Sequence, residues 1–206
     1  LQLPDSLTSY EYRAFADCSN LEKINYPISL TSGAFGAFQN DTKLTEITVP
    51  EGVKTLAPGA FQNASSLKKI TLPAGLTKIG NAAFQSCTGL TEIDIPDSVT
   101  EIGEYAFQDC RNVKKLILPD GLKRYGYRAF SDCELLETIN YPQKLEEGGA
   151  NAFQNDKMLS EIIIPDGTET IAAHAFDGAS YLQNVQLPDS LKEIKNAAFQ
   201  NCTAMR

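Results

Sequence analysis

The five cysteines are the residues of this 206-residue chain best suited to redox or metal chemistry. Each lies three residues after a phenylalanine, and they are Cys18, Cys87, Cys110, Cys133 and Cys202. Zinc and dithiol redox sites use closely spaced pairs such as CxxC, and the sequence contains none. An odd number of cysteines cannot be fully disulfide-paired, and stacked side chains would run parallel rather than converge. The pattern predicts buried, reduced thiols.

Other chemistry would need His174, the single histidine, or the carboxylates. A histidine-dependent nucleophile or a multi-histidine metal centre requires partners that the chain lacks. The carboxylates fall at turns and at alternate strand positions, where a solvated face is the ordinary interpretation, although calcium at the repeated turn aspartates is an alternative. We therefore predict a protein that is not an enzyme and that has no cofactor and no metal site.

Charge and hydropathy limit the partners. The chain has 18 basic and 26 acidic residues, a net charge of −8, and no basic cluster. Such a chain repels the phosphate backbone, so we expect no nucleic-acid partner. No apolar run approaches the roughly 20 residues of a membrane span, and no signal-like segment precedes the repeats, so we expect no membrane insertion by this fragment. We expect a monomer.

A fixed period of 23 residues runs through the whole chain. An Ala-Phe pair recurs without insertion at Phe15, Phe38, Phe61, Phe84, Phe107, Phe130, Phe153, Phe176 and Phe199. Such a period is typical of a solenoid. We predict one domain, residues 1–206, of about nine repeats, in which residues 1–4 end a preceding repeat. Both ends are expected to be truncated, because polar caps are missing and the chain stops where a strand should begin.

The apolar residues define one turn of the solenoid. In residues 97–119 they are Val99, Ile102, Phe107, Cys110, Val113, Leu116 and Leu118. Their spacing is three or more at first and two at the end, which indicates a helix-like turn followed by a strand. Proline then ends the strand, because it cannot donate a ladder hydrogen bond. Consecutive strands run in the same direction, so we predict one parallel sheet.

Two further patterns concern the arrangement of the repeats. Gly33 and Gly148 replace an isoleucine, and the preceding repeat offers Tyr10 or Tyr125 in the same column, so that large beside small keeps the volume constant. Residues 12–27 match residues 127–142 at twelve of sixteen positions. A block of five repeats was therefore duplicated with an offset of 115 residues.

The segment LTKIGNAAFQSCTGLTEIDIP at residues 76–96 resembles the bacterial leucine-rich repeats of the BspA-like or Treponema type. The matching residues are Leu76, Ile79, Gly80, Ala83, Phe84, Cys87, Leu90, Ile93, Ile95 and Pro96. The sequence departs from the pattern at Asp41, Ala64, Asp156 and Ala179 in the cysteine column and at Gly33 and Gly148, and these changes are expected to loosen the second and seventh repeats.

The resemblance covers the whole chain and implies an α/β repeat solenoid. This is a right-handed leucine-rich repeat array with a single curved parallel β-sheet on the concave side and short helical or 3-10 turns on the convex side. It also implies a secreted or cell-surface protein of host-associated bacteria, or of some mucosal protozoa, that acts in adhesion or protein binding. The family carries no catalytic motif to transfer.

Two columns of outward strand residues could contact a partner. The first is Lys23, Glu46, Lys69, Glu92, Lys115, Thr138, Glu161 and Asn184. Its alternating charges predict cross-strand pairs. The second is Asn25, Thr48, Thr71, Asp94, Ile117, Asn140, Ile163 and Gln186. An apolar strand side chain gains nothing from facing water. Ile117 and Ile163 therefore indicate either a binding role or simple β-propensity. The predicted ligand-binding residues on the concave face are Lys115, Ile117, Asn140, Glu161 and Ile163.

An alternative contact surface is a convex aromatic patch. It consists of Tyr12, Phe35, Tyr105 and Tyr127, which lie two or three residues before the repeat phenylalanine. Exposed aromatic residues anchor many interfaces, although these could instead pack against one another across neighbouring turns. The sequence thus predicts a non-catalytic surface or secreted module that binds a host or cell-surface protein or glycan. The alternative is a passive stalk or spacer that presents another domain.

Overall fold

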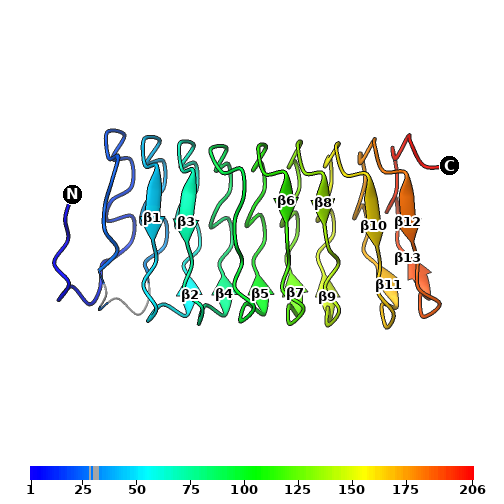
Figure 1. The fold of residues 1–206 in the computed structure, drawn as a ribbon, viewed down its shortest axis with the longest axis horizontal. Coiled ribbons are helices and arrows are strands. Elements are labelled where there is room, and N and C mark those ends of the chain that lie inside the picture. Colours follow the sequence, from blue (N-terminus) through cyan, green and yellow to red (C-terminus); the bar gives the residue numbers. More distant parts are fainter. Residues whose placement is uncertain (28, 30–32) are drawn as a thin grey trace.

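The chain forms a single file of similar coils, with its two termini at opposite ends (Figure 1). The computed structural model describes residues 1–27, 29 and 33–206. Every strand pair is parallel and joins residues 23 apart in sequence, as in Glu46 with Lys69 and Glu161 with Asn184. The predicted solenoid of parallel strands is therefore confirmed.

The first strand row contains the strands that the sequence predicted. It consists of β1 (Glu46–Thr48), β3 (Lys69–Thr71), β6 (Lys115–Leu116), β8 (Thr138–Ile139), β10 (Glu161–Ile163) and β12 (Asn184–Gln186). Outward residues alternate with an inward one, so that Ile47 and Ile162 are buried between exposed neighbours. The row pairs as β1-β3, β6-β8 and β10-β12, and the segment at Glu92 to Asp94 has no strand.

The second strand row lies beside the first along the array (Figure 1). It consists of β2 (Thr55–Leu56), β4 (Lys78–Ile79), β5 (Glu101–Ile102), β7 (Arg124–Tyr125), β9 (Glu147–Gly148), β11 (Thr170–Ile171) and β13 (Glu193–Ile194). The single curved sheet expected from the sequence is thus corrected to two rows divided into five sheets. Each second-row strand has only two residues, too few for a period-two pattern to be distinguished from a helical one.

The side opposite the first row consists of turns, and the structure assigns no helix to the residues it describes. The residues two before and two after each repeat phenylalanine have positive φ, as at Ala82 (54°) and Ser86 (58°). The N–H groups of these two residues and of the phenylalanine between them donate to the next repeat, as from Phe84 to Ala106 O (2.8 Å), whereas those of Ala83 and Gln85 donate within their own turn. The predicted helical or 3-10 turns are corrected, because left-handed residues interrupt helical hydrogen bonding.

The repeat phenylalanines form a continuous stack along the axis. Neighbouring ring centroids are 5.2 to 5.8 Å apart with interplanar angles between 5° and 19°. Seven of the nine rings are fully buried, and only Phe15 and Phe199 at the ends are partly exposed. The repeats containing Asp41 and Asp156 keep this stack at 5.3 to 5.6 Å, so the expected loosening does not reach the rings.

The predicted compensation of glycine by tyrosine is present in the core. Tyr125 pairs in register with Gly148, and a Cβ at Gly148 would lie 2.8 Å from Tyr125 Oη. The tyrosine ring packs edge-on against Phe130 and Phe153 at 5.6 and 5.7 Å. Gly33 likewise has the hydroxyl of Tyr10 3.1 Å from its Cβ position. A tyrosine of the preceding repeat therefore fills the space that each glycine leaves in the core.

Candidate binding face

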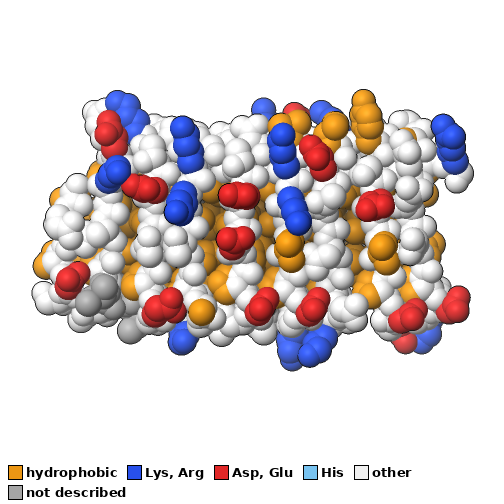
Figure 2. All heavy atoms as spheres, viewed as in Figure 1, with side chains coloured by type: hydrophobic (Ala, Val, Ile, Leu, Met, Phe, Trp, Pro, Cys, Tyr) orange, Lys and Arg blue, Asp and Glu red, His pale blue; other side chains and the backbone are white. Residues whose placement is uncertain are grey.

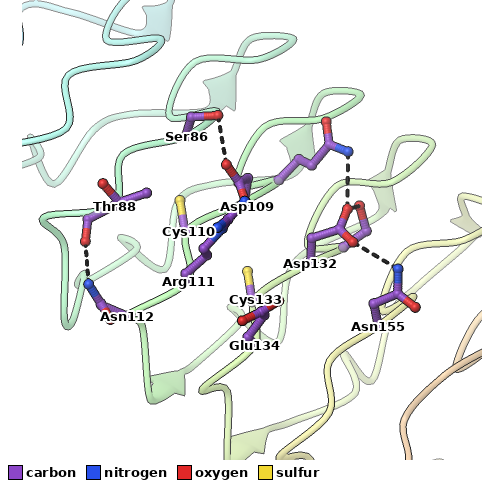
Figure 3. Close-up of polar contacts among 12 residues, drawn as sticks. Ser86, Thr88, Asp109, Cys110, Arg111, Asn112, Asp132, Cys133, Glu134 and Asn155 are labelled. Atoms are coloured by element: carbon purple, nitrogen blue, oxygen red, sulfur yellow. Dashed lines mark hydrogen bonds and ion pairs between the residues drawn. The ribbon is translucent and has the colours of Figure 1, made fainter.

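The buried cysteines act as structural donors. The thiols of Cys87, Cys110 and Cys133 lie 3.0, 3.2 and 3.3 Å from the carbonyl oxygen of the repeat phenylalanine in the preceding repeat, which is Phe61, Phe84 and Phe107 respectively. Figure 3 shows two of them stacked beneath polar links such as Ser86 to Asp109. Burial raises the pKa of the Cys110 thiol to about 12, so the nucleophilic thiolate is suppressed.

The cysteines at the two ends differ from the prediction. All five are unpaired, but Cys18 is exposed and Cys202 is only partly buried. The first repeat has no full coil stacked on its outer side, so Cys18 is not covered. Among the described residues, no group of three or more histidines, cysteines or carboxylates could hold a metal ion. The described residues also contain no helix with the length and apolarity that a membrane crossing requires.

Two aspartates occupy the cysteine column with their carboxyl groups buried. The Oδ1 atoms of Asp41 and Asp156 accept the backbone N–H of Cys18 and Cys133, both at 2.9 Å. Within the described structure, both Oδ2 atoms are buried without a hydrogen-bond partner. Burial raises the pKa of Asp41 to about 7, and it raises the pKa of Asp156 well above its ordinary value. A neutral carboxyl supplies a hydroxyl donor, as the thiol does at this position.

We expect Asp156→Asn to be more stable than the wild type by an amount that grows as the pH rises. The native state retains a proton that the unfolded chain, with a carboxyl pKa of 3.8, releases. The wild type therefore loses stability above about pH 4, by up to about 1.4 kcal/mol per pH unit, until the native pKa is reached. Urea unfolding of both proteins between about pH 4 and 7 measures the difference.

The same substitution at exposed Asp166 controls for the loss of one negative charge. Because Asp41 titrates in the same range, the Asp41→Asn/Asp156→Asn double variant should show a steeper gain than either single variant. If the difference in unfolding free energy between the wild type and Asp156→Asn stays constant with pH, Asp156 is ionised in the folded protein.

The five predicted ligand-binding residues lie along one groove of the first strand row. Lys115, Ile117, Asn140, Glu161 and Ile163 all line it, and its volume is about 400 Å³. The side chains of Ile117 and Ile163 are 59% and 57% exposed. Buried Tyr141 also lines the groove. Figure 2 shows this face, where isolated hydrophobic side chains lie beside a row of charged ones.

Ile117 separates this groove from a second one. The second groove, of about 340 Å³, shares Lys115 and Ile117 with the first and extends over the repeat that contains Glu92 and Asp94. We refer to the two grooves together as the binding face. The isoleucine is thus a ridge with hollows on both sides, rather than one apolar residue on a flat surface.

The structure assigns Asn140 a backbone role. Its side-chain amide accepts the N–H of Leu118 at 2.7 Å and donates to the Leu118 carbonyl at 2.8 Å. The amide thereby takes the place of backbone hydrogen bonds just beyond the end of the β6-β8 ladder, next to buried Tyr141. Asn25 makes the same two contacts with Leu3, one duplicated block earlier. Asn140 lines the groove, but its hydrogen-bonding capacity is largely used inside the protein.

The expected self-pairing of the charged column is largely absent. Lys23 and Glu46 form an ion pair at 2.8 Å. Across the described residues, Lys69, Glu92 and Lys115 make no ion pair within 4.0 Å. A position in register on neighbouring strands is not sufficient for an ion pair, because long exposed side chains lose rotamer entropy when they pair and gain little electrostatic energy in water. The charges on this face are therefore available to a partner.

Three carboxylates at the edge of the face were not among the predicted ligand-binding residues. Asp94 and Asp97 line the smaller groove, and Asp120 lines the larger one. All three are exposed, and none forms an ion pair within the described chain. For Asp97 and Asp120 the available signal was the Pro-Asp turn at the end of the strand, which recurs at Asp5, Asp166 and Asp189.

The second strand row shows what self-pairing looks like. Lys78 Nζ lies 3.0 Å from Glu101, and Arg124 Nε lies 3.9 Å from the same carboxylate. These residues line a hollow of about 530 Å³ that also contains Glu147 and several glycines. A Cβ on Gly103, Gly126 or Gly149 would meet the backbone of the preceding repeat, as for Gly126 against the backbone N of Glu104. Chain packing therefore explains this surface.

The convex aromatic residues form two pairs rather than one patch. Tyr12 stacks on Phe35 with centroids 5.4 Å apart, and Tyr105 meets Tyr127 edge-on at the same distance. Two complete repeats separate the pairs, which places them roughly 14 Å apart at about 4.8 Å per repeat. The four residues therefore do not form one continuous patch, and each pair packs across neighbouring turns, which was the other interpretation of the sequence.

Comparison with known proteins agrees with the fold. The T. pallidum leucine rich repeat protein (TpLRR) superposes with a TM-score of 0.65 and 24% identity over 89% of this chain and 77% of its own. The pneumococcal vaccine antigen PcpA gives a TM-score of 0.50 and 25% identity over 91% of this chain and 59% of its own. A search of curated proteins found no significant match.

A sequence model of one repeat family matches the chain from end to end. Its description is "BspA type Leucine rich repeat region (6 copies)", and it matches residues 1–91 and again residues 77–206. The matched segments contain the strand rows, the phenylalanine stack and the cysteine column described above. The chain therefore belongs to the BspA-type leucine-rich repeat family.

Proposed function

We propose that this array is a non-catalytic binding module of a cell-surface or secreted protein. Its partner is a host or cell-surface protein or glycan, which it contacts through the binding face. Leucine-rich repeat proteins are generally binding or structural modules, and one similar structure is described as a pneumococcal vaccine antigen. A single copy of the chain suffices for this function.

The observation that carries the proposal is the pair of exposed isoleucines on a grooved strand face. Ile117 and Ile163 expose more than half of their surface and line the same groove. Parallel strands present side chains at regular intervals of about 4.8 Å, so an extended partner touches many repeats through few residues of each. Desolvated apolar residues next to polar groups are typical of interface centres.

A passive stalk or spacer is the second candidate. The rigid phenylalanine stack and the separation of the termini by the full array would suit that role (Figure 1). A stalk, however, gains nothing from unpaired charges and exposed isoleucines gathered on one face. The two candidates therefore differ in whether this face binds anything.

We expect Ile117→Ser with Ile163→Ser to weaken partner binding by on the order of 1 to 3 kcal/mol in total. The thermal midpoint should stay nearly unchanged, because both side chains face water in the free protein. The measurement is saturable binding of the fluorescently labelled protein to cultured mucosal epithelial cells, with circular dichroism melting of both proteins.

The matched control is Thr48→Ser with Thr71→Ser, which changes exposed residues of the same column elsewhere on the array. This variant should bind the cells as the wild type does. Equal binding by wild type and the isoleucine variant would exclude the binding face. Absence of saturable wild-type binding would favour the stalk, and unfolding of the isoleucine variant would show that the two side chains stabilise the core.

A further inference from the structure

We propose that the binding face recognises an extended polypeptide segment in which an arginine or lysine lies two residues from an apolar residue. The basic side chain occupies the smaller groove and the apolar side chain occupies the larger one, so that the segment crosses the ridge of Ile117. This inference rests on the proposed function, because it names the partner class of the same face.

The two grooves differ in charge. The smaller groove is lined by the exposed carboxylates of Glu92, Asp94 and Asp97, with Lys115 as its single cation. None of these side chains forms an ion pair within the described residues, so the negative charges are not compensated inside the protein. A cationic side chain is therefore the complementary occupant of this groove.

The larger groove is more apolar. Its walls are Ile117 and Ile163, and Tyr141 and Pro165 also contribute to its lining. Covering the two exposed isoleucines removes apolar surface from water, which favours an apolar side chain between them. Asp120 and Glu161 lie on this groove with Lys115, so a flanking basic residue is also tolerated.

The spacing of the grooves fits an extended chain. The smaller groove lies between the repeat of Asp94 and that of Ile117, and the larger one is centred on the repeat of Asn140. Their centres are therefore one and a half strand spacings apart, about 7.2 Å. Side chains two residues apart on an extended chain project to the same side at about 6.6 Å. One intervening residue then faces solvent above the ridge.

A folded helix fits this face less well. The walls formed by Ile117 and Ile163 belong to repeats two spacings apart, roughly 9.6 Å, whereas a helix with side chains is about 10–12 Å wide. Ladder hydrogen bonds point along the array toward neighbouring repeats, as in the β6-β8 and β10-β12 pairs, so the face itself offers mainly side chains. Recognition must therefore depend on the type and spacing of the partner's side chains.

The test uses synthetic nine-residue peptides with a central Arg-Thr-Ile flanked by glycine and serine. Titration into the ¹⁵N-labelled full chain should give saturable amide shifts concentrated around Asp94, Ile117 and Ile163. A peptide with Arg and Ile adjacent, and one with Glu in place of Arg, should each bind about tenfold more weakly. Binding should also weaken with added salt.

Two variants test the grooves separately. Asp94→Asn with Asp97→Asn removes charge from the smaller groove, and Ile117→Ser with Ile163→Ser removes the apolar walls of the larger one. Each should weaken the Arg-Thr-Ile peptide about tenfold, and only the first should reduce the salt dependence. Thr48→Ser with Thr71→Ser should leave binding unchanged. All these substitutions are at exposed side chains, and dichroism melting confirms that the variants fold.

The outcomes separate this inference from the proposed function. Equal binding of the three peptides, shifts elsewhere on the array, or no binding of any peptide overturns the recognition of a basic and an apolar residue. If cell binding still requires Ile117 and Ile163 in that case, the proposed function stands without it. If the Ile117→Ser/Ile163→Ser variant binds as tightly as the wild type in both the cell experiment and the peptide titration, the proposed function and this inference are both overturned.

Discussion

Phe107→Ala is expected to destabilise the array by about 3 to 5 kcal/mol, because it removes a close-packed ring from the centre of the phenylalanine stack. The ring is buried and stacks on Phe84 and Phe130 with centroids 5.2 and 5.8 Å away. Truncation leaves a cavity between two rings that are fixed by inter-turn hydrogen bonds, so the neighbours cannot collapse into it. Chemical denaturation followed by circular dichroism measures the loss.

Phe199→Ala is the matched control, because this ring stacks on Phe176 alone and is partly exposed. It should cost less than half as much as the interior truncation. Because repeat arrays share stability between neighbours, the interior variant should also broaden the unfolding transition as the two halves uncouple. Equal costs at the two positions would show that the stack does not act as a continuous spine.

Gly148→Ile is expected to destabilise the protein by about 3 kcal/mol, although it introduces the residue found at the same repeat position in Ile171. The reason is Tyr125, whose hydroxyl would lie 2.8 Å from the new Cβ and whose ring is held between Phe130 and Phe153. A comparison of repeats alone would rate this substitution as stabilising.

The compensating change tests that reason. Tyr125→Ile should be destabilising alone, since it leaves space above Gly148, and the double variant should be less destabilised than the sum of the two by at least about 2 kcal/mol. Denaturant unfolding of the four proteins gives the coupling free energy. Additive effects would mean that the two positions do not share one volume. Gly121→Ala is a useful control, because its Cβ would meet nothing closer than 3.6 Å.

Much of the fold was predictable from spacing. Phe107 and its eight equivalents define the period, and a constant period forces identical coils to stack in register. The pairing of Tyr125 with Gly148 also followed from it, because residues 23 apart share a column. The second strand row was missed, since strands as short as Lys78–Ile79 carry no distinguishing pattern. The helical turns were wrong because local spacing does not report the sign of φ.

The candidate site was predicted less completely. Ile117 and Ile163 were identified because an apolar residue at an outward position is unusual, and both are exposed in the structure. The self-paired charges were wrong at Lys69 and Lys115, and the amide of Asn140 bonds to the backbone of Leu118 instead of facing a partner. Spacing alone offered no reason to group the turn aspartates with the isoleucines.

The sequence by itself determined the period, the family, the inward columns and the outward positions, because each depends only on which residues recur 23 apart. The tertiary structure alone decided which outward side chains use their polar groups inside the protein, and where the surface is hollow. Those properties depend on how far apart neighbouring coils lie and which rotamers their side chains adopt. Asn140 lies just beyond the end of the β6-β8 ladder, and its amide bonds to the backbone of Leu118. Ile117, in the same column, forms a ridge between two grooves.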